Sequence, residues 1–166
     1  MPGLAGGRCA CRPYAAVVAS PLGVLGLVLD PAGALTRLDY LTRRARPYAL
    51  PVAASLARQL TAALNAGDAL PDWPLAPEGT PYQQRVWRAL RAIPAGQTVT
   101  YGALARRLKS GARAVAAACR ANPIPVLIPC HRVVAAAGLG GYDGATDGPK
   151  LARKRWLLHR EGTLPA

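Results

Sequence analysis

One cysteine of this chain stands between a proline and a histidine, in the segment LIPCHRVV at residues 127–134. A thiol becomes a strong nucleophile where a neighbouring base or cation favours its thiolate. His131 follows Cys130 directly, and Glu161 closes the last predicted helix, where its carboxylate could orient an imidazole. These three groups could act as nucleophile, base and orienting group. The alternative is that Cys130 is a small apolar residue of the core, which is common beside an apolar run.

Prolines set the backbone around this cysteine. Pro123, Pro125 and Pro129 exclude a helix and favour extended chain. Adjacent side chains on extended backbone point to opposite faces. His131 therefore need not touch the sulfur of Cys130, and a water could bridge the two side chains.

The charge of the chain is strongly positive and unevenly placed. The sequence has 21 Lys and Arg against 8 Asp and Glu, a net charge of +13. No acidic residue lies between Glu78 and Asp143. A surface that neutralises phosphates needs many cations and few anions. This pattern therefore favours a surface that binds nucleic acid over helix faces that are only solvated. The basic residues in this interval are Arg85, Arg88, Arg91, Arg106, Arg107, Lys109, Arg113, Arg120 and Arg132.

The cysteines do not indicate disulfides or a metal. There are four, Cys9, Cys11, Cys119 and Cys130, in a chain of 166 residues, too few for a disulfide framework. Cys9 and Cys11 form a C-x-C pair, but a zinc site needs about four ligands. We expect no metal, and a loose, reduced N-terminal tail.

The first half of the chain predicts a small sheet and one helix. The apolar run at 14–29 is broken by SPLG and closed by Asp30, which favours two strands and a turn over a signal peptide. A third strand is expected at 34–41, and a helix at 51–67 that ends at Gly67. No apolar stretch is long enough to span a membrane, so we expect a cytoplasmic protein.

The second half predicts short helices. Helices are expected at 80–93, 100–111, 112–122 and 151–162, the first two capped by threonine. The pair at 100–111 and 112–122 resembles a helix-turn-helix.

The fold class expected is α/β (α+β), with a boundary in the proline-rich stretch 68–81. Residues 1–13 form an unassigned tail, and 14–75 a small N-terminal α/β subdomain. Residues 76–166 form a mostly helical, winged helix-turn-helix-like subdomain that carries the active-site cysteine.

Three segments of this second half carry a resemblance to a known family. NPIPVLIPCHRVV, YQQRVWRALRAIPAGQTVTYGALA and ARAVAAACRANP resemble the O6-alkylguanine-DNA alkyltransferases, also called methylated-DNA–protein-cysteine methyltransferases. The resemblance is strong over 80–162 and weak over 14–70. It implies direct DNA repair by irreversible transfer of an alkyl group from guanine in duplex DNA to the protein.

The resemblance implies a catalytic role for six residues. Cys130 accepts the alkyl group, His131 takes its proton through a water, and Glu161 orients His131. Asn122 braces the active-site strand, Tyr101 can protonate the leaving guanine, and Lys154 lies near the thiolate.

It also implies how DNA is held. The helix-turn-helix enters the minor groove and Arg113 fills the gap left by a flipped nucleotide. The implied DNA-binding residues are Tyr101, Ala112, Arg113, Ala114, Ala117 and Arg120. The implied substrate pocket contains Pro125, Val133, Tyr142 and Asp143.

No cofactor is implied, and the expected partner is double-stranded DNA containing O6-alkylguanine, bound by a monomer away from any membrane. Asp143 stands where the family usually has a neutral or basic residue, and ATDGPK at 145–150 looks inserted. Both bear on the range of alkyl groups accepted. Two other functions remain open: a lesion-binding protein without transfer activity, whose known examples lack the cysteine, and a winged-helix regulator with a structural cysteine.

Overall fold

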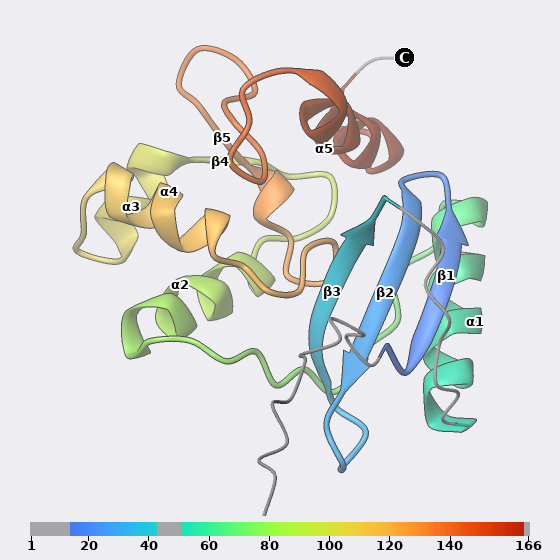
Figure 1. The fold of residues 1–166 in the computed structure, drawn as a ribbon. Helices are drawn as coiled ribbons and strands as arrows, with labels where there is room; N and C mark the ends of the chain where they lie inside the picture. Colours follow the sequence, from blue (N-terminus) through green and yellow to red (C-terminus); the bar gives the residue numbers. More distant parts are fainter. Residues whose placement is uncertain (1–13, 43–50, 165–166) are drawn as a thin grey trace, which may run out of the picture.

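The computed structural model describes residues 14–42 and 51–164 (Figure 1). Its first element is an antiparallel sheet in the order β1-β2-β3, formed by Ala16–Ser20, Gly23–Leu29 and Leu35–Leu41. The three strands predicted from the sequence are therefore confirmed.

Helix α1 (Pro51–Ala66) packs against this sheet beside β1 (Figure 1). Its leucines recur four residues apart and turn one apolar face inward, so that Leu56 and Leu60 are fully buried. Gly67 follows with a φ of 77°, a conformation that suits glycine and stops the helix. The predicted helix at 51–67 is confirmed.

Helix α2 (Pro81–Arg91) has Thr80 as its N-cap, as predicted, and Thr80 forms a capping box with Gln83. The Gln83 amide donates to Thr80 Oγ1 over 3.2 Å, and the Thr80 amide donates to Gln83 Oε1 over 2.8 Å. Its apolar face buries Trp87, whose indole N–H donates to the carbonyl of Ala118 over 2.9 Å. This bond fastens α2 to the helix that carries Ala118.

Helices α3 (Tyr101–Arg107) and α4 (Ala112–Arg120) pack on each other across a short turn. Thr100 caps α3 by accepting from the Ala103 amide over 3.1 Å. Lys109 in the turn has a φ of 49°, and Gly111 is the N-cap of α4. The predicted helix-turn-helix is thus confirmed.

The remaining elements surround the predicted site. Strands β4 (Val99–Thr100) and β5 (Val133–Val134) pair in parallel. Helix α5 (Gly148–Arg160) starts three residues before the predicted 151, because Pro149 fits a first helical turn.

The segment before Cys130 corrects one expectation, since it is not extended. Val126 has a φ of 76°, and the Ile128 amide donates to the Ile124 carbonyl over 2.9 Å. Cys130–Arg132 then form one turn of 3-10 helix. Proline removes amide donors but is well suited to turns, so the three prolines produce a folded loop.

The sheet braces this loop from the other half of the chain. The Leu38 amide in β3 donates to the Pro123 carbonyl over 2.8 Å. Leu35 exchanges backbone hydrogen bonds with the proline-rich stretch at Pro74 and Ala76. One apolar cluster runs through both halves, so the N-terminal sheet and the C-terminal helices share a core.

Two sequence expectations concern metals and membranes. Cys9 and Cys11 lie outside the described residues. Within residues 14–42 and 51–164, no three His, Cys, Asp or Glu side chains gather in a way that could hold a metal ion. No helix in these ranges is long and apolar enough to cross a membrane.

Candidate active site

Cys130 lies on the wall of a cavity of about 200 Å³, here named the reaction cavity. The side chain is buried, with 7% of the residue exposed. The cavity lies between α3, α4 and the loop that precedes α5. Its lining residues are Tyr101, Ala116, Cys119, Arg120, Cys130, Gly141, Tyr142, Asp143, Gly144, Ala145 and Thr146.

His131 and Glu161 meet, as the sequence hypothesis requires. His131 Nε2 and Glu161 Oε1 are 2.8 Å apart, and the two side chains are 0% and 2% exposed. Arg132 binds the same carboxylate through two bonds, from Nε to Oε2 over 3.0 Å and from Nη2 to Oε1 over 2.8 Å. A bidentate arginine fixes the plane of the carboxylate and so the orientation of the imidazole.

This contact decides which nitrogen of His131 can act as a base. Burial alone would raise the pKa of Glu161, but hydrogen bonds from His131 and Arg132 outweigh it and lower the pKa to about 2. The ionised carboxylate only accepts, so the neutral imidazole carries its proton on Nε2. Nδ1 is buried and makes no hydrogen bond with the described residues, which leaves its lone pair available for a proton. Burial also lowers the pKa of His131, so the ring is neutral at neutral pH.

The thiol of Cys130 needs such a base. Burial raises its pKa to about 11, although a hydrogen bond with Asn122 and the charge of Lys154 both lower it. At neutral pH the resting group is therefore a thiol, and the thiolate forms only when a base takes the proton.

Asn122 and Lys154 hold the backbone around the cavity. Asn122 donates to the Ile128 carbonyl over 2.8 Å and accepts from the Ile124 amide over 3.0 Å, which braces the loop that leads to Cys130. Lys154 is fully buried and its Nζ donates to the carbonyls of Val133 and Gly141 over 2.6 and 3.1 Å. Burial lowers the pKa of Lys154 to about 8.

Two tyrosines line the cavity. Burial raises the pKa of Tyr101 to about 12, and its hydroxyl donates to the Gly141 carbonyl over 3.4 Å. Burial also raises the pKa of Tyr142 well above its usual value. Both phenols stay protonated at neutral pH.

Tyr40 is a positioning residue that sequence reasoning missed. Its hydroxyl lies 2.9 Å from that of Tyr142, and Arg153 lies over its ring at 4.1 Å from the centroid. Strand β3 therefore fixes one wall of the reaction cavity. Tyr40 and Tyr142 are 102 positions apart, and no local pattern links them.

Two other lining or supporting residues were also missed. Cys119 lies on the cavity wall, although its sequence context only marks the apolar face of a helix. Arg132 was considered only as one of the basic residues of the chain. Because it follows His131 directly, the sequence could have suggested that it also binds Glu161.

Pro125 and Val133 are not among the residues that line the reaction cavity. Pro125 lines a neighbouring hollow of about 350 Å³, which Asn122 and Asp143 also border. Val133 is fully buried because β5 pairs with β4, and it contributes a carbonyl to Lys154 instead. These two placements differ from the pocket that the sequence resemblance implies.

The expected DNA-binding residues of α4 share its outer face. Val115, Ala118 and Cys119 turn inward, which leaves the opposite side to solvent. The exposed residues are Ala112, Arg113, Ala114, Ala117 and Arg120. Three of these five residues are alanines, whose small side chains allow another molecule to approach the helix closely.

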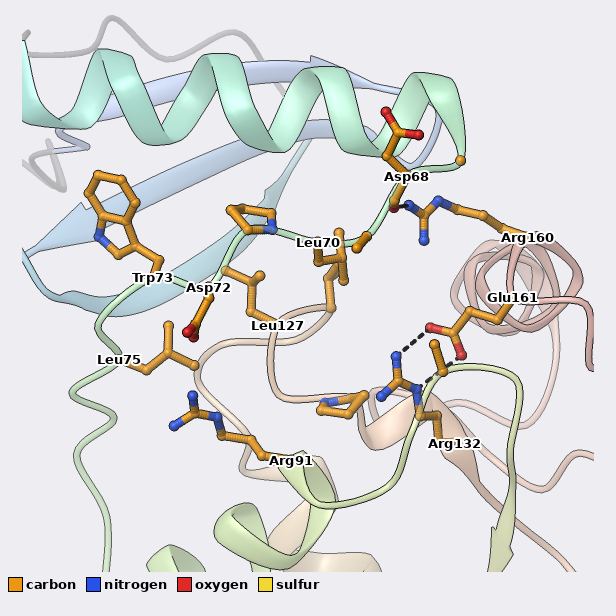
Figure 2. Close-up of a pocket in the computed structure, with 16 residues that line it drawn as sticks. Asp68, Leu70, Asp72, Trp73, Leu75, Arg91, Leu127, Arg132, Arg160 and Glu161 are labelled. Atoms are coloured by element: carbon orange, nitrogen blue, oxygen red, sulfur yellow. Dashed lines mark hydrogen bonds and ion pairs between the residues drawn. The ribbon is translucent and has the colours of Figure 1, made fainter.

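A larger cavity of about 520 Å³ is lined by the Arg132–Glu161 pair (Figure 2). It opens between the end of α1, the proline-rich stretch and α5, and Arg160 reaches across it to the Asp68 carbonyl. Cys130 and His131 do not line this larger cavity, whereas Cys130 lines the reaction cavity.

The comparison that decides the family covers residues 81–163, half of the chain. These residues match the family model described as 6-O-methylguanine DNA methyltransferase, DNA binding domain. The chain belongs to this methyltransferase family. The resemblance noted in the sequence is thereby confirmed.

Relatives of this methyltransferase family match the chain to different extents. A methylated-DNA–protein-cysteine methyltransferase of Salmonella typhimurium is 53% identical over 89 residues, which are 52% of this chain and 49% of that protein. The chain thus spans about half the length of this curated relative. A DNA base-flipping protein of Thermus thermophilus is 41% identical over 150 residues, 87% of this chain and 97% of that protein.

Solved methyltransferase structures share the fold. The crystal structure of Mycobacterium tuberculosis O6-methylguanine methyltransferase has a TM-score of 0.73 and 37% identity, covering 90% of this chain and 93% of that one. A structure of the M. tuberculosis protein in complex with DNA has a TM-score of 0.72 and 39% identity over 90% and 94% of the two chains. The mixed α+β fold expected from the sequence is confirmed.

Proposed function

We propose that this protein repairs DNA by transferring a methyl or other alkyl group from O6 of guanine in duplex DNA to its own Cys130. The observation that carries the proposal is the placement of the Cys130 thiol in a cavity, next in the chain to a histidine that an ionised glutamate holds at 2.8 Å. A core cysteine would need neither the cavity nor the buried His131–Glu161–Arg132 group.

The transfer is a single displacement. The proton of Cys130 passes through a water to Nδ1 of His131, and the imidazolium is stabilised by Glu161. The thiolate sulfur bonds to the alkyl carbon while the bond from that carbon to O6 breaks. The bonding pair stays with O6, and Tyr101 supplies the proton that yields neutral guanine. His131 regenerates the phenol of Tyr101 through solvent, so the net reaction converts a thiol and O6-alkylguanine into a thioether and guanine.

The substrate must leave the base stack to react. Cys130 is buried on the wall of a cavity, so an alkyl group inside a duplex cannot reach it. Arg113, exposed at the start of α4, is suited to fill the gap left in the stack. The acid-free interval 79–142 supplies the positive charge that binds phosphates.

The same proposal covers the oligomeric state, the location and the cofactor requirement of the protein. The protein acts as a monomer in the cytoplasm, without a metal or an organic cofactor. A lesion-binding protein without transfer is the second candidate, favoured by the similarity to a protein named for base flipping. The Cys130 thiol beside His131 favours transfer over binding alone.

The stoichiometry of repair tests the proposal. A thioether does not revert to a thiol under cellular redox chemistry. With methylated-guanine duplex in excess, the amount of methyl group removed should rise to one equivalent per protein molecule and then stop. Sustained turnover would exclude Cys130 as a terminal acceptor, and no removal at all would favour the binding protein.

Arg113→Ala should impair nucleotide flipping without impairing the alkyl transfer itself. The variant should transfer slowly from duplex DNA, because the extruded base has no replacement in the stack, yet react nearly normally with the free base O6-methylguanine. The ratio of the two rate constants should fall by about tenfold to a hundredfold, in line with a flipping cost of a few kcal/mol. Arg58→Ala, at an exposed position of α1 outside the acid-free interval, is the matched control and should leave the ratio unchanged. Equal losses on both substrates would assign Arg113 a structural role.

A further inference from the structure

An ion pair stands at the mouth of the reaction cavity. Asp143 Oδ2 lies 3.0 Å from Lys150 Nζ, and the same Nζ donates to the Asp143 carbonyl over 2.9 Å. The two side chains are 43% and 46% exposed, so the pair lies at the surface. Asp143 is at the same time a lining residue of the cavity that contains Cys130.

The backbone holds Asp143 in this place. The Tyr142 and Ala145 backbones exchange hydrogen bonds of 2.8 and 3.0 Å, which closes a two-residue turn. Asp143 and Gly144, the two central residues, have φ values of 49° and 77°. Asp-Gly is a preferred sequence for turns with two positive φ angles. Asparagine suits the same backbone, so the charge of residue 143 can be changed without changing the turn.

The negative charge of Asp143 acts on the thiol of Cys130. Burial is the main cause of the raised pKa of Cys130, and the charge of Asp143 raises it further. Asp143 also borders the neighbouring hollow of about 350 Å³. Two carboxylates are among the described residues that line this hollow, and no lysine or arginine is. They are Asp143 and Asp39, of which Asp39 is paired with Arg37 over 3.0 Å.

The transferred substituent occupies space that the carboxylate of Asp143 borders. Its first carbon bonds to the sulfur of Cys130, so any further atoms lie in the reaction cavity or the hollow beside it. A methyl group has no further atoms and carries no charge. A carboxymethyl group places a negative charge in the space that Asp143 borders.

We propose that Asp143 is a specificity-determining residue that discriminates against negatively charged O6 substituents. This inference rests on the proposed alkyl transfer, and it names the substituents that the site favours: methyl groups and larger neutral or cationic groups. Two cations moderate the discrimination. The ammonium of Lys150 neutralises part of the charge of Asp143, and Arg120 lines the reaction cavity.

The test compares two substituents of nearly the same shape and different charge. Rate constants for transfer to the protein are measured with duplexes that contain O6-carboxymethylguanine or O6-carbamoylmethylguanine. The ratio of the neutral to the anionic rate constant is formed within each variant, so that a general loss of activity cancels. For the unmodified protein the ratio should be about ten, the effect of like charges several ångströms apart at an intermediate dielectric constant.

Three variants make the ratio informative. Asp143→Asn should lower the ratio to one or below, because Arg120 and Lys150 remain. Lys150→Met should increase the ratio a few-fold, because the carboxylate of Asp143 loses its partner. Asp147→Asn removes a charge from an exposed position of the same loop and should leave the ratio unchanged. The opposite directions at Asp143 and Lys150 keep the inference testable even if one of these variants does not fold.

The outcomes separate this inference from the proposed function. Transfer from O6-methylguanine with the same ratio in the unmodified protein and in Asp143→Asn would overturn the role of Asp143 alone. Absence of transfer even from O6-methylguanine would overturn the proposed function and the inference with it.

Discussion

Cys130→Ser should abolish alkyl transfer while the protein still folds and binds duplex DNA that contains O6-methylguanine. Serine has nearly the shape of cysteine, but its hydroxyl has a far higher pKa than a thiol, and oxygen is the weaker nucleophile toward an alkyl carbon. Neutral His131 cannot ionise that hydroxyl to a useful extent. The outer face of α4 is unchanged by the substitution, so DNA binding should persist.

The same preparation should be used for thermal unfolding, lesion binding and methyl transfer. Cys119→Ser is the matched control, because it places a hydroxyl on the wall of the same cavity without removing the acceptor. Each serine should cost about 1–3 kcal/mol of stability if its hydroxyl is left unpaired. The Cys119 variant should still take up one methyl group per molecule. Transfer by folded Cys130→Ser protein would exclude Cys130 as the nucleophile.

Glu161→Gln should both destabilise the protein and slow the reaction. The amide keeps the shape of the side chain, but Arg132, 11% exposed, loses its carboxylate partner. Removing one partner of a buried ion pair costs about 3–5 kcal/mol. The imidazolium that forms when His131 takes the proton also loses its stabilising charge, so transfer should slow by about a hundredfold, the size of a general-base contribution.

Acid unfolding distinguishes this charge effect from a packing defect. The pKa of Glu161 is lowered from 4.5 to about 2 in the folded protein. A lowered carboxylate pKa stabilises the fold fully above the unfolded value, and this stability is lost as the pH falls through the folded value. The free energy of unfolding contributed by Glu161 should therefore disappear between about pH 4.5 and 2, and Glu161→Gln should lack this dependence.

Glu78→Gln is the control for the same substitution at an exposed position. It should change the free energy of unfolding by less than about 0.5 kcal/mol and leave the acid dependence assigned to Glu161 in place. An acid dependence between pH 4.5 and 2 that is identical in the unmodified protein and in Glu161→Gln would show that the Glu161 pair does not contribute as proposed.

Features determined by neighbouring residues could be predicted from the sequence. The capping box at Thr80 and Gln83 follows from residues three positions apart. The sequence suggested a contact between His131 and Glu161 only because these residue types often act together in catalysis. The structure adds its geometry, a distance of 2.8 Å between the two side chains.

Features determined by tertiary contacts could not be predicted in this way. The loop before Cys130 folds because its prolines sit in turns supported by Asn122 and by β3, whereas proline pattern alone favours extended chain. The Tyr40–Tyr142 contact joins segments that no periodicity relates. Pro125 and Val133 were placed by resemblance, and the pairing of β5 with β4 decides where Val133 lies.

The most direct test of the central claim is the mass of the intact protein after incubation with duplex DNA that contains O6-methylguanine, followed by peptide mapping. The proposed mechanism predicts a gain of one methyl group on each active molecule, located on the peptide that contains Cys130. An unchanged mass in protein that binds the lesion, or a methyl group located on Cys119 instead, would contradict the assignment of Cys130 as the alkyl acceptor.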